Sequence, residues 1–282
     1  MMESYLLGYG LMIVLCGVES ILLDMTHTFD NTSICWPNGQ AKFQLKILAK
    51  GLQPGGFWYQ GDDITSGIHV GTHMDAPCHF YKDRWCIDEI PIGRLVNRPV
   101  VMIDIRQKAA QSPDVNVTLD DLKRFETKYG KIPSGAVVVQ CSGWSDKYPD
   151  VAAVFGNNRE DTSDFHFPAF SVAAADFLIE QRGIVGVAVD TPSVDYGQAD
   201  IYPVHVLLCN HNLYLLENVK DTCLLPPIGA TLTSLPSKIK GSSGAATRVF
   251  ASWTFSVSRA GRVHYRFKFV VVLLTLITTY LP

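Results

Sequence analysis

The chain has 282 residues and a mass of 31.2 kDa, which allows one large domain or two small ones. Its 47% hydrophobic and 18% charged residues are typical of a folded globular protein and exclude a disordered or low-complexity chain. The formal net charge of −3, without any cluster of lysine and arginine, argues against nucleic acid as a partner. The mean hydropathy of +0.12 is slightly high, and both ends of the chain contribute to it.

The first segment is an apolar run over residues 5–18, followed by Glu19 and Ser20, and it predicts a signal peptide over residues 1–20. A buried N-terminal helix is the alternative, because no basic residue precedes the run. Asn31 and Asn116 each begin an Asn-x-Ser/Thr sequon, which agrees with a secreted glycoprotein. We therefore expect a protein that is secreted or held at the outer cell surface, and a cytoplasmic one if the N-terminal segment is not cleaved.

Short apolar runs alternate with turn-forming residues through the middle of the chain. Strands are predicted over 43–48, 100–105, 136–140, 185–190 and 212–217, because these runs are rich in Val, Ile or Leu. One helix is predicted from a Thr118 cap to Tyr129, and another over 172–182, capped by Ser171 and ended by Gly183. A helix that leads directly into a strand is typical of α/β architecture, and no linker divides the chain.

Three histidines and a carboxylate, His69, His73, Asp75 and His79, fall within eleven residues. Imidazole and carboxylate are ligands that zinc, manganese and iron share, so this cluster predicts a metal site. Neither a straight strand nor a helix gathers these side chains around one ion. The chain must therefore bend, and Gly71 and the Ala76-Pro77 step are the places where it can.

A second group, His205, His211 and Glu217, lies on and before the predicted strand 212–217. Glu217 ends an apolar run, and a buried carboxylate suits a cation site; an edge-strand glutamate that faces water is the alternative. His211 has no assigned role. Asp190 and Asp195 are expected to be structural residues that fix a turn after a buried strand.

The C-terminal residues 269–281 are apolar and uncharged, but they are too few to span a membrane as a helix. Together with small residues at Ser258, Ala260 and Gly261 they resemble a lipid-anchor signal over 256–282, which would attach the protein to a membrane. A last β-strand is the alternative, since Val, Ile, Thr and Tyr favour strands.

Six cysteines remain after Cys16, which the predicted signal peptide contains. No Cys-x-x-Cys spacing occurs, which argues against a thiolate zinc site. Six cysteines allow fifteen pairings, and only Cys78 and Cys86 are close enough in sequence for us to expect a bridge across one loop.

The chain resembles the metal-dependent cyclase family, which includes bacterial-type kynurenine formamidase and isatin hydrolase. The resemblance spans residues 22–251 and is carried by the motif over 69–80, by Asp190-Thr-Pro-Ser-Val-Asp195, and by His205 and Glu217-Asn218. It implies an α/β fold, a compact β/β/α hydrolase domain over 21–255 with a central mixed sheet and few helices. It also implies a homo-oligomer, either a dimer or a tetramer.

The resemblance assigns roles to individual residues. In the formamidase branch one metal lies on His69, His73, Asp75 and Glu217, a second lies on Asp75, His205 and Glu217, His79 is the acid/base, and Trp36 borders the substrate pocket. The isatin hydrolase branch holds a single ion, often manganese. The metal is therefore expected to be zinc or manganese, with one or two ions per chain.

A bound divalent ion brings the pKa of its water to about 7, and a histidine can pass a proton to a departing amide nitrogen. We accordingly expect a metal-dependent amidohydrolase for a small aromatic amide, most specifically an N-formylkynurenine formamidase of tryptophan catabolism, with Trp36, Phe80 or Trp144 as pocket walls. The alternatives are an isatin-type lactam hydrolase and a catalytically idle secreted metal-binding protein. Serine catalysis is disfavoured because no Gly-x-Ser-x-Gly motif is present.

Overall fold

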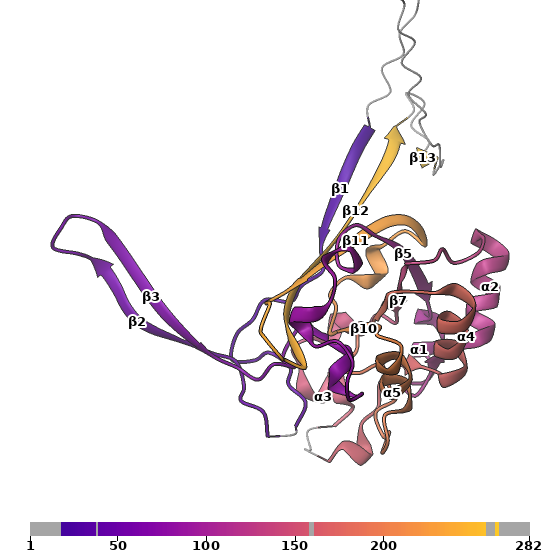
Figure 1. Cartoon of the computed structure of the whole chain (residues 1–282), viewed down its shortest axis with the longest axis horizontal. Coiled ribbons are helices and arrows are strands. Elements are labelled where there is room, and N and C mark those ends of the chain that lie inside the picture. The colour runs from indigo at the N-terminus through magenta and orange to yellow at the C-terminus, as the bar shows by residue number, and fades with distance from the viewer. Residues whose placement is uncertain (1–17, 38, 158–160, 258–262, 265–282) are drawn as a thin grey trace, which may run out of the picture. The chain divides into compact units, whose positions relative to one another are not determined.

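The computed structural model describes residues 18–37, 39–157, 161–257 and 263–264 (Figure 1). Two compact units are distinguished, one of Leu22–Trp253 and one of Met1–Ile21 with Thr254–Pro282. Most of the predicted signal peptide and of the apolar C-terminal tail lies outside the described residues. Within the described residues, no helix is both long enough and apolar enough to cross a membrane.

The strands are β1 (Val18–Asp24), β2 (Gln44–Leu52), β3 (Trp58–Thr65), β4 (His73–Asp75), β5 (Arg98–Asp104), β6 (Asn116–Val117), β7 (Val137–Cys141), β8 (Ala169–Phe170), β9 (Gly186–Ala188), β10 (Tyr214–Glu217), β11 (Ile228–Pro236), β12 (Gly244–Val257) and β13 (Val263–His264). The α-helices are α1 (Arg106–Ala109), α2 (Leu119–Tyr129), α3 (Val151–Phe155), α4 (Val172–Arg182) and α5 (Pro203–Asn210). All five predicted strands and both predicted helices are confirmed, with shifts of a few residues at the strand ends. Helix α5, which carries His205 and precedes the strand predicted over 212–217, was not among the predicted elements.

The main sheet closes on itself in the order β12, β11, β5, β7, β9, β10 and β4, because β4 pairs with both β10 and β12. The strands β5, β7, β9 and β10 are parallel to one another. The pairs β12–β11, β11–β5, β10–β4 and β4–β12 are antiparallel. This mixed sheet with few helices confirms the expected α/β class.

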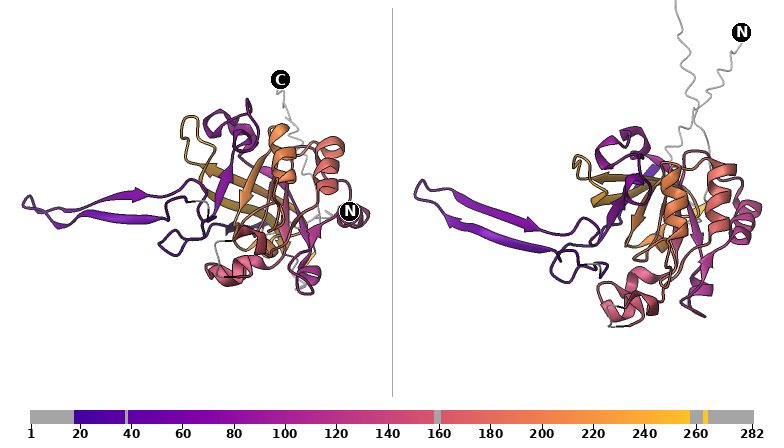
Figure 2. Two further views of the ribbon diagram at one scale, coloured as in Figure 1. Left: turned by 90° about the horizontal axis from the view of Figure 1, so that it is seen from below. Right: turned by 60° about the horizontal axis from the view of Figure 1, so that its bottom comes forward.

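Both faces of the parallel strands are buried, as expected for strands made almost wholly of apolar residues. On β7, Val137 and Val139 belong to one apolar cluster with Met74 and Leu216, whereas Val138 belongs to the other, which includes residues of α2, α4 and α5. Helices α2 and α4 lie side by side on that second face (Figures 1 and 2). The closed sheet therefore provides a rigid frame for the loops at its edge.

The two predicted helices begin with the expected caps. Thr118 accepts a hydrogen bond from the backbone N–H of Asp121, and the Asp121 carboxylate accepts one from the N–H of Thr118 in return. The Ser171 hydroxyl accepts a hydrogen bond from the backbone N–H of Ala174 and so caps α4, and Gly183 ends that helix with a φ of 58°. Side-chain caps of this kind satisfy backbone groups that the first turn leaves unpaired.

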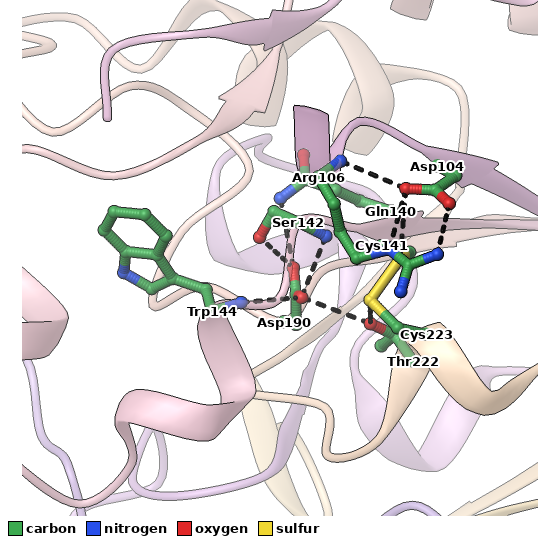
Figure 3. Close-up of a disulfide and its surroundings, with 9 residues drawn as sticks. All are labelled: Asp104, Arg106, Gln140, Cys141, Ser142, Trp144, Asp190, Thr222 and Cys223. Atoms are coloured by element: carbon green, nitrogen blue, oxygen red, sulfur yellow. Dashed lines mark hydrogen bonds and ion pairs between the residues drawn. A yellow bond between two sulfur atoms is a disulfide. The ribbon is translucent and has the colours of Figure 1, made fainter. Parts of the chain in front are cut away.

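The expected disulfide between Cys78 and Cys86 is present, and a second one joins Cys141 to Cys223. The second bridge ties the end of β7 to the turn after β10, beside the buried carboxylate of Asp190 (Figure 3). Asp190 accepts hydrogen bonds from the backbone N–H groups of Ser142 and Trp144 and from the Thr222 hydroxyl. Asp190 therefore holds loops together, as expected for a structural residue, and burial raises the pKa of its carboxyl.

Candidate metal centre and active site

The histidine motif bends at the two predicted places. Gly71 has a φ of 59°, a left-handed conformation that favours glycine, and Pro77 begins a short 3-10 helix over Pro77–His79. Between these bends lies β4, which carries His73 and Asp75 on the same side of one short strand. The bends bring His69 and His79 back towards Asp75, so the motif converges where neither a straight strand nor a helix could.

Two segments distant in the sequence complete the cluster. Glu217 lies at the end of β10, directly opposite His73 in the antiparallel pair of β10 and β4. His205 projects from the first turn of α5 and is buried. His211, by contrast, lies at the end of α5 with its Nδ1 2.9 Å from the carbonyl oxygen of Leu207, and it takes no part in the cluster.

The carboxylate of Asp75 is the centre of the cluster. Its Oδ1 lies 2.7 Å from His69 Nδ1 and 3.1 Å from His73 Nε2. Its Oδ2 lies 3.3 Å from His205 Nε2 and 3.9 Å from His79 Nε2. Each oxygen of Asp75 therefore faces a different pair of imidazoles.

The two oxygens of Glu217 also face different imidazoles. Its Oε2 lies 3.4 Å from His73 Nε2, and its Oε1 lies 3.2 Å from His205 Nε2. Asp75 and Glu217 consequently both span the gap between His73 and His205. Two carboxylates that bridge two neighbouring metal positions need this arrangement.

The donor set fits a divalent cation. Asp75 and Glu217 are both buried, and none of the described residues that line the pocket above them is a lysine or arginine. The Nε2 atom of His73 is buried between the two carboxylates without a hydrogen-bond partner. Buried carboxylates and an unpartnered imidazole nitrogen are costly unless a cation joins them. Two triads, His73 with Asp75 and Glu217, and His69 with Asp75 and His79, each bring their ligand atoms within 4.8 Å of one another.

Before any ion binds, the two buried carboxylates raise the pKa of the two imidazoles that lie between them, His73 and His205. Burial lowers the pKa of His73, but Asp75 and Glu217 outweigh burial and raise it to about 10. Burial lowers the pKa of His79 to about 4, although Asp75 opposes this shift. His79 is thus a neutral imidazole near pH 7, and its side chain keeps 29% of its surface exposed at the pocket.

Further contacts orient two histidines of the cluster, His205 and His73. Asp195 Oδ2 lies 2.7 Å from His205 Nδ1, and the same carboxylate accepts hydrogen bonds from the backbone N–H groups of Val204 and His205. Asp195 therefore caps α5 and also orients His205, whereas the sequence indicated only a turn residue. His73 Nδ1 lies 3.0 Å from the carbonyl oxygen of Gly71, which turns Nε2 towards the carboxylates.

A cavity of about 220 Å³ opens above the cluster. Its apolar walls include Ile34, Trp36, Phe80 and Tyr202. The Trp36 ring is held edge-on by Phe165 and Tyr202, with ring centroids 5.4 and 6.4 Å away. Trp36 and Phe80 therefore line this cavity. Trp144 does not line the cavity: it belongs to the apolar cluster of Phe155, Phe165 and Phe167, against which Trp36 packs.

Comparisons with known proteins identify the family. The family model named Cyclase matches residues 23–196. Isatin hydrolase of Roseibium aggregatum is 33% identical over 197 residues, which cover 67% of this chain and 73% of that protein. Kynurenine formamidase of Bacillus cytotoxicus is 26% identical over 197 residues, covering 70% of this chain and 81% of that protein.

Solved structures agree with this result. Isatin hydrolase A from Ralstonia solanacearum superposes with a TM-score of 0.75 at 31% identity, covering 83% of this chain and 92% of that chain. An isatin hydrolase bound to the product analogue thioisatinate gives a TM-score of 0.75 at 28% identity, covering 83% of this chain and 92% of that chain. Since the family model matches more than half of the chain, the protein belongs to the Cyclase family and is a metal-dependent hydrolase.

Proposed function

We propose that the protein hydrolyses the amide C–N bond of a small aromatic substrate, with one or two divalent ions held by His69, His73, Asp75, His205 and Glu217. The observation that carries the proposal is the division of the Asp75 and Glu217 oxygens between two sets of imidazoles. In this proposal His69, His73, Asp75 and Glu217 hold one ion, and Asp75, His205 and Glu217 hold a second. Nitrogen and oxygen ligands of this kind suit zinc and manganese alike.

The bound ion would acidify a water and polarise the attacked carbonyl. The protein supplies the proton transfers. His79 lies beside the cluster, it is exposed to the pocket, and its pKa of about 4 keeps it neutral and able to accept a proton from the attacking water. It can then donate that proton to the departing nitrogen, whose protonation an amide requires. His79 is therefore the proposed acid/base.

The pocket chemistry favours a flat, uncharged substrate. Trp36, Phe80 and Tyr202 offer aromatic faces and edges, and the described lining residues include no lysine or arginine to bind a free carboxylate. Isatin, a cyclic aryl amide, carries no charge and so needs no charged side chain in this pocket. N-formylkynurenine shares the aryl amide, but its amino-acid group would need partners on the polar side of the pocket, where Gln40, Ser193 and Asn218 lie.

A direct assay separates the two substrates. The metal-reconstituted protein is given isatin and N-formylkynurenine in parallel, and kcat/KM is measured for each. We expect turnover of an aryl amide, with isatin preferred because it brings no charge into the pocket. Preference for N-formylkynurenine would assign the protein to the formamidase branch, and turnover of neither substrate would contradict the aryl amide proposal.

We further propose that the protein acts outside the cytoplasm. Disulfides form and persist in oxidising compartments, and two are present here. Of the two sequon asparagines, Asn31 is exposed, whereas Asn116 is half-buried and lies in strand β6. A single glycan on Asn31 is therefore expected in a eukaryotic host, and a mass shift after glycosidase treatment that is absent from Asn31→Gln tests it. The lipid anchor at 256–282 stays a prediction, tested by release from membranes with a phospholipase.

A further inference from the structure

The imidazole of His69 is held at both of its nitrogen atoms. Its Nδ1 lies 2.7 Å from Asp75 Oδ1, and its Nε2 lies 3.0 Å from the hydroxyl oxygen of Ser243. His73 and His205, in contrast, turn Nε2 towards the carboxylates of the cluster. Of these three proposed ligands, all in the described part of the chain, His69 is the one that presents Nδ1.

Strand pairing brings Ser243 to His69, although 174 residues separate them in the sequence. Strand β12 begins at Gly244, which is paired with Asp75 of β4. The carbonyl oxygen of Ser243 accepts a hydrogen bond of 2.8 Å from the backbone N–H of Ala76. The closed sheet therefore fixes the backbone of Ser243 and Gly244 beside the histidine motif.

Gly244 provides the space in which the His69 ring lies. A Cβ atom on Gly244 would be 2.6 Å from Cε1 and 3.0 Å from Nδ1 of His69, and 2.7 Å from the carbonyl oxygen of Met74. Contacts this short are well inside the optimal van der Waals separation, so a side chain would displace the ring or strand β4. The close approach of the imidazole to the backbone thus requires glycine at this position.

The hydroxyl of Ser243 suits a metal-binding histidine. A histidine that ligates through Nδ1 carries its proton on Nε2, and a hydroxyl oxygen can accept the hydrogen bond from that N–H. Metal-binding histidines usually donate their other ring N–H to an oxygen atom, and this contact fixes the tautomer and the orientation of the ring. Ser243 Oγ lies where such a partner of His69 is needed.

We propose that Ser243 and Gly244 position His69 so that it binds the divalent ion through Nδ1. Ser243 accepts the hydrogen bond from the Nε2–H group, and Gly244 leaves room for the ring against β12. The inference rests on the proposed function, because it takes His69 as a ligand. Both residues are positioning residues and not ligands, since Ser243 acts through the ring nitrogen that Asp75 does not contact.

Competition with a chelator measures the affinity of the purified full chain for Zn²⁺. Ser243→Ala should weaken binding by about 10–100-fold, the usual loss when a ligating histidine loses its oxygen partner. Ser243→Thr keeps the hydroxyl and should retain most of the wild-type affinity. Ser242→Ala is the matched control, since the Ser242 hydroxyl donates to the Gly244 carbonyl oxygen and not to His69. Equal affinity of Ser243→Ala and wild type, or an equal loss in Ser242→Ala, would overturn the proposal.

Gly244→Ala tests the space for the ring. This variant should lose at least as much zinc affinity as Ser243→Ala, because the added methyl group displaces His69 from Asp75. Gly93→Ala is the control, since a Cβ atom on Gly93 meets nothing within 4 Å. Circular dichroism establishes that both variants fold, and the serine variants test the proposal even if Gly244→Ala does not. A folded Gly244→Ala with wild-type affinity would contradict the role of Gly244.

Nitrogen NMR of the zinc-loaded protein, with isotope-labelled histidine, identifies the ligating atom of each ring. We expect His69 to carry its proton on Nε2, and His73 to carry it on Nδ1, which lies 3.0 Å from a backbone carbonyl oxygen. A His69 ring that binds zinc through Nε2 would overturn the proposal. Wild type that binds no zinc would contradict the proposed function itself, whereas zinc binding that Ser243→Ala leaves unchanged contradicts this inference alone.

Discussion

Asp195 Oδ2 lies 2.7 Å from Nδ1 of His205, whose Nε2 faces both Asp75 and Glu217. This contact fixes the imidazole with Nδ1 as the donor and Nε2 free to ligate. The same carboxylate caps α5, the helix that carries His205. One buried side chain therefore sets the position of the helix and the orientation of a proposed metal ligand.

Replacing Asp195 by Asn tests this role. Asparagine still caps a helix, so α5 should persist, but an amide holds the imidazole less strongly than a carboxylate. Loss of such a partner typically costs 10–100-fold in metal affinity, and we expect a loss of about that size in a chelator competition assay. Asp190→Asn is the control, because Asp190 is also buried but faces loop N–H groups. Equal affinity in wild type and Asp195→Asn would show that the contact is only structural.

The number of ions per chain follows from the division of the carboxylate oxygens. If two ions bind, His205→Ala removes a ligand of one ion only, and metal analysis should give about one ion fewer per chain than in the wild type. Asp75→Ala removes the residue that both sets share and should reduce occupancy at both. If the wild type binds one ion and His205→Ala keeps it, the second position does not exist.

His79→Ala is expected to lower kcat by about 10²–10⁴-fold, the usual contribution of an acid/base residue. Metal content should stay unchanged, since the ligand set proposed above does not require His79. His79 nevertheless belongs to a triad with His69 and Asp75 whose atoms could share an ion. Metal analysis of the variant decides between these roles, because the loss of an ion would make His79 a ligand.

Much of the fold could be predicted from the sequence because local signals were strong. The apolar runs of β5 and β7 and the caps at Thr118 and Ser171 each determine structure over a few residues. The sequence did not predict helix α5 (Pro203–Asn210), because a short apolar run does not distinguish a helix from a strand. Closure of the sheet depends on β4, three residues long, which pairs with strands far along the chain.

In the candidate site, too, local features could be predicted from the sequence, whereas long-range contacts could not. The density of His69, His73 and Asp75 and the need for bends at Gly71 and Pro77 are local, and the structure confirms the bends. The contact of Asp195 with His205 depends on where α5 begins, so the sequence indicated only a turn. The pairing of Cys141 with Cys223, which are 82 residues apart, is likewise fixed by the packing of distant loops and not by spacing.

The two disulfides should differ in their effect on stability. In the chain-entropy model a bridge across 82 residues contributes about 4.5 kcal/mol and one across 8 residues about 2.5 kcal/mol. Urea unfolding of the variants Cys141→Ala/Cys223→Ala and Cys78→Ala/Cys86→Ala measures both. The larger loss is expected for the first variant, also because Cys141 is fully buried. The opposite order would contradict loop closure as the main contribution.

His27 makes stability depend on pH. Its ring stacks on Tyr148 with centroids 3.8 Å apart, and burial, aided by Lys220, lowers its pKa from 6.5 to about 4. Between these values the unfolded chain binds a proton that the folded chain does not, so the free energy of unfolding falls as the pH falls from about 6.5 to about 4. The expected loss between pH 7.5 and pH 5 is about 2 kcal/mol for this residue.

His27→Phe keeps the stacked ring but removes the titrating group. Urea unfolding at pH 7.5 and pH 5 should therefore show a smaller difference in this variant than in the wild type, by about 2 kcal/mol. His211→Phe, at an exposed position away from the metal ligands, serves as the control for the replacement of a histidine by phenylalanine. Because other groups titrate equally in all three proteins, their contributions cancel in the comparison. An unchanged difference in His27→Phe would mean that His27 is protonated in the folded protein as readily as in the unfolded chain.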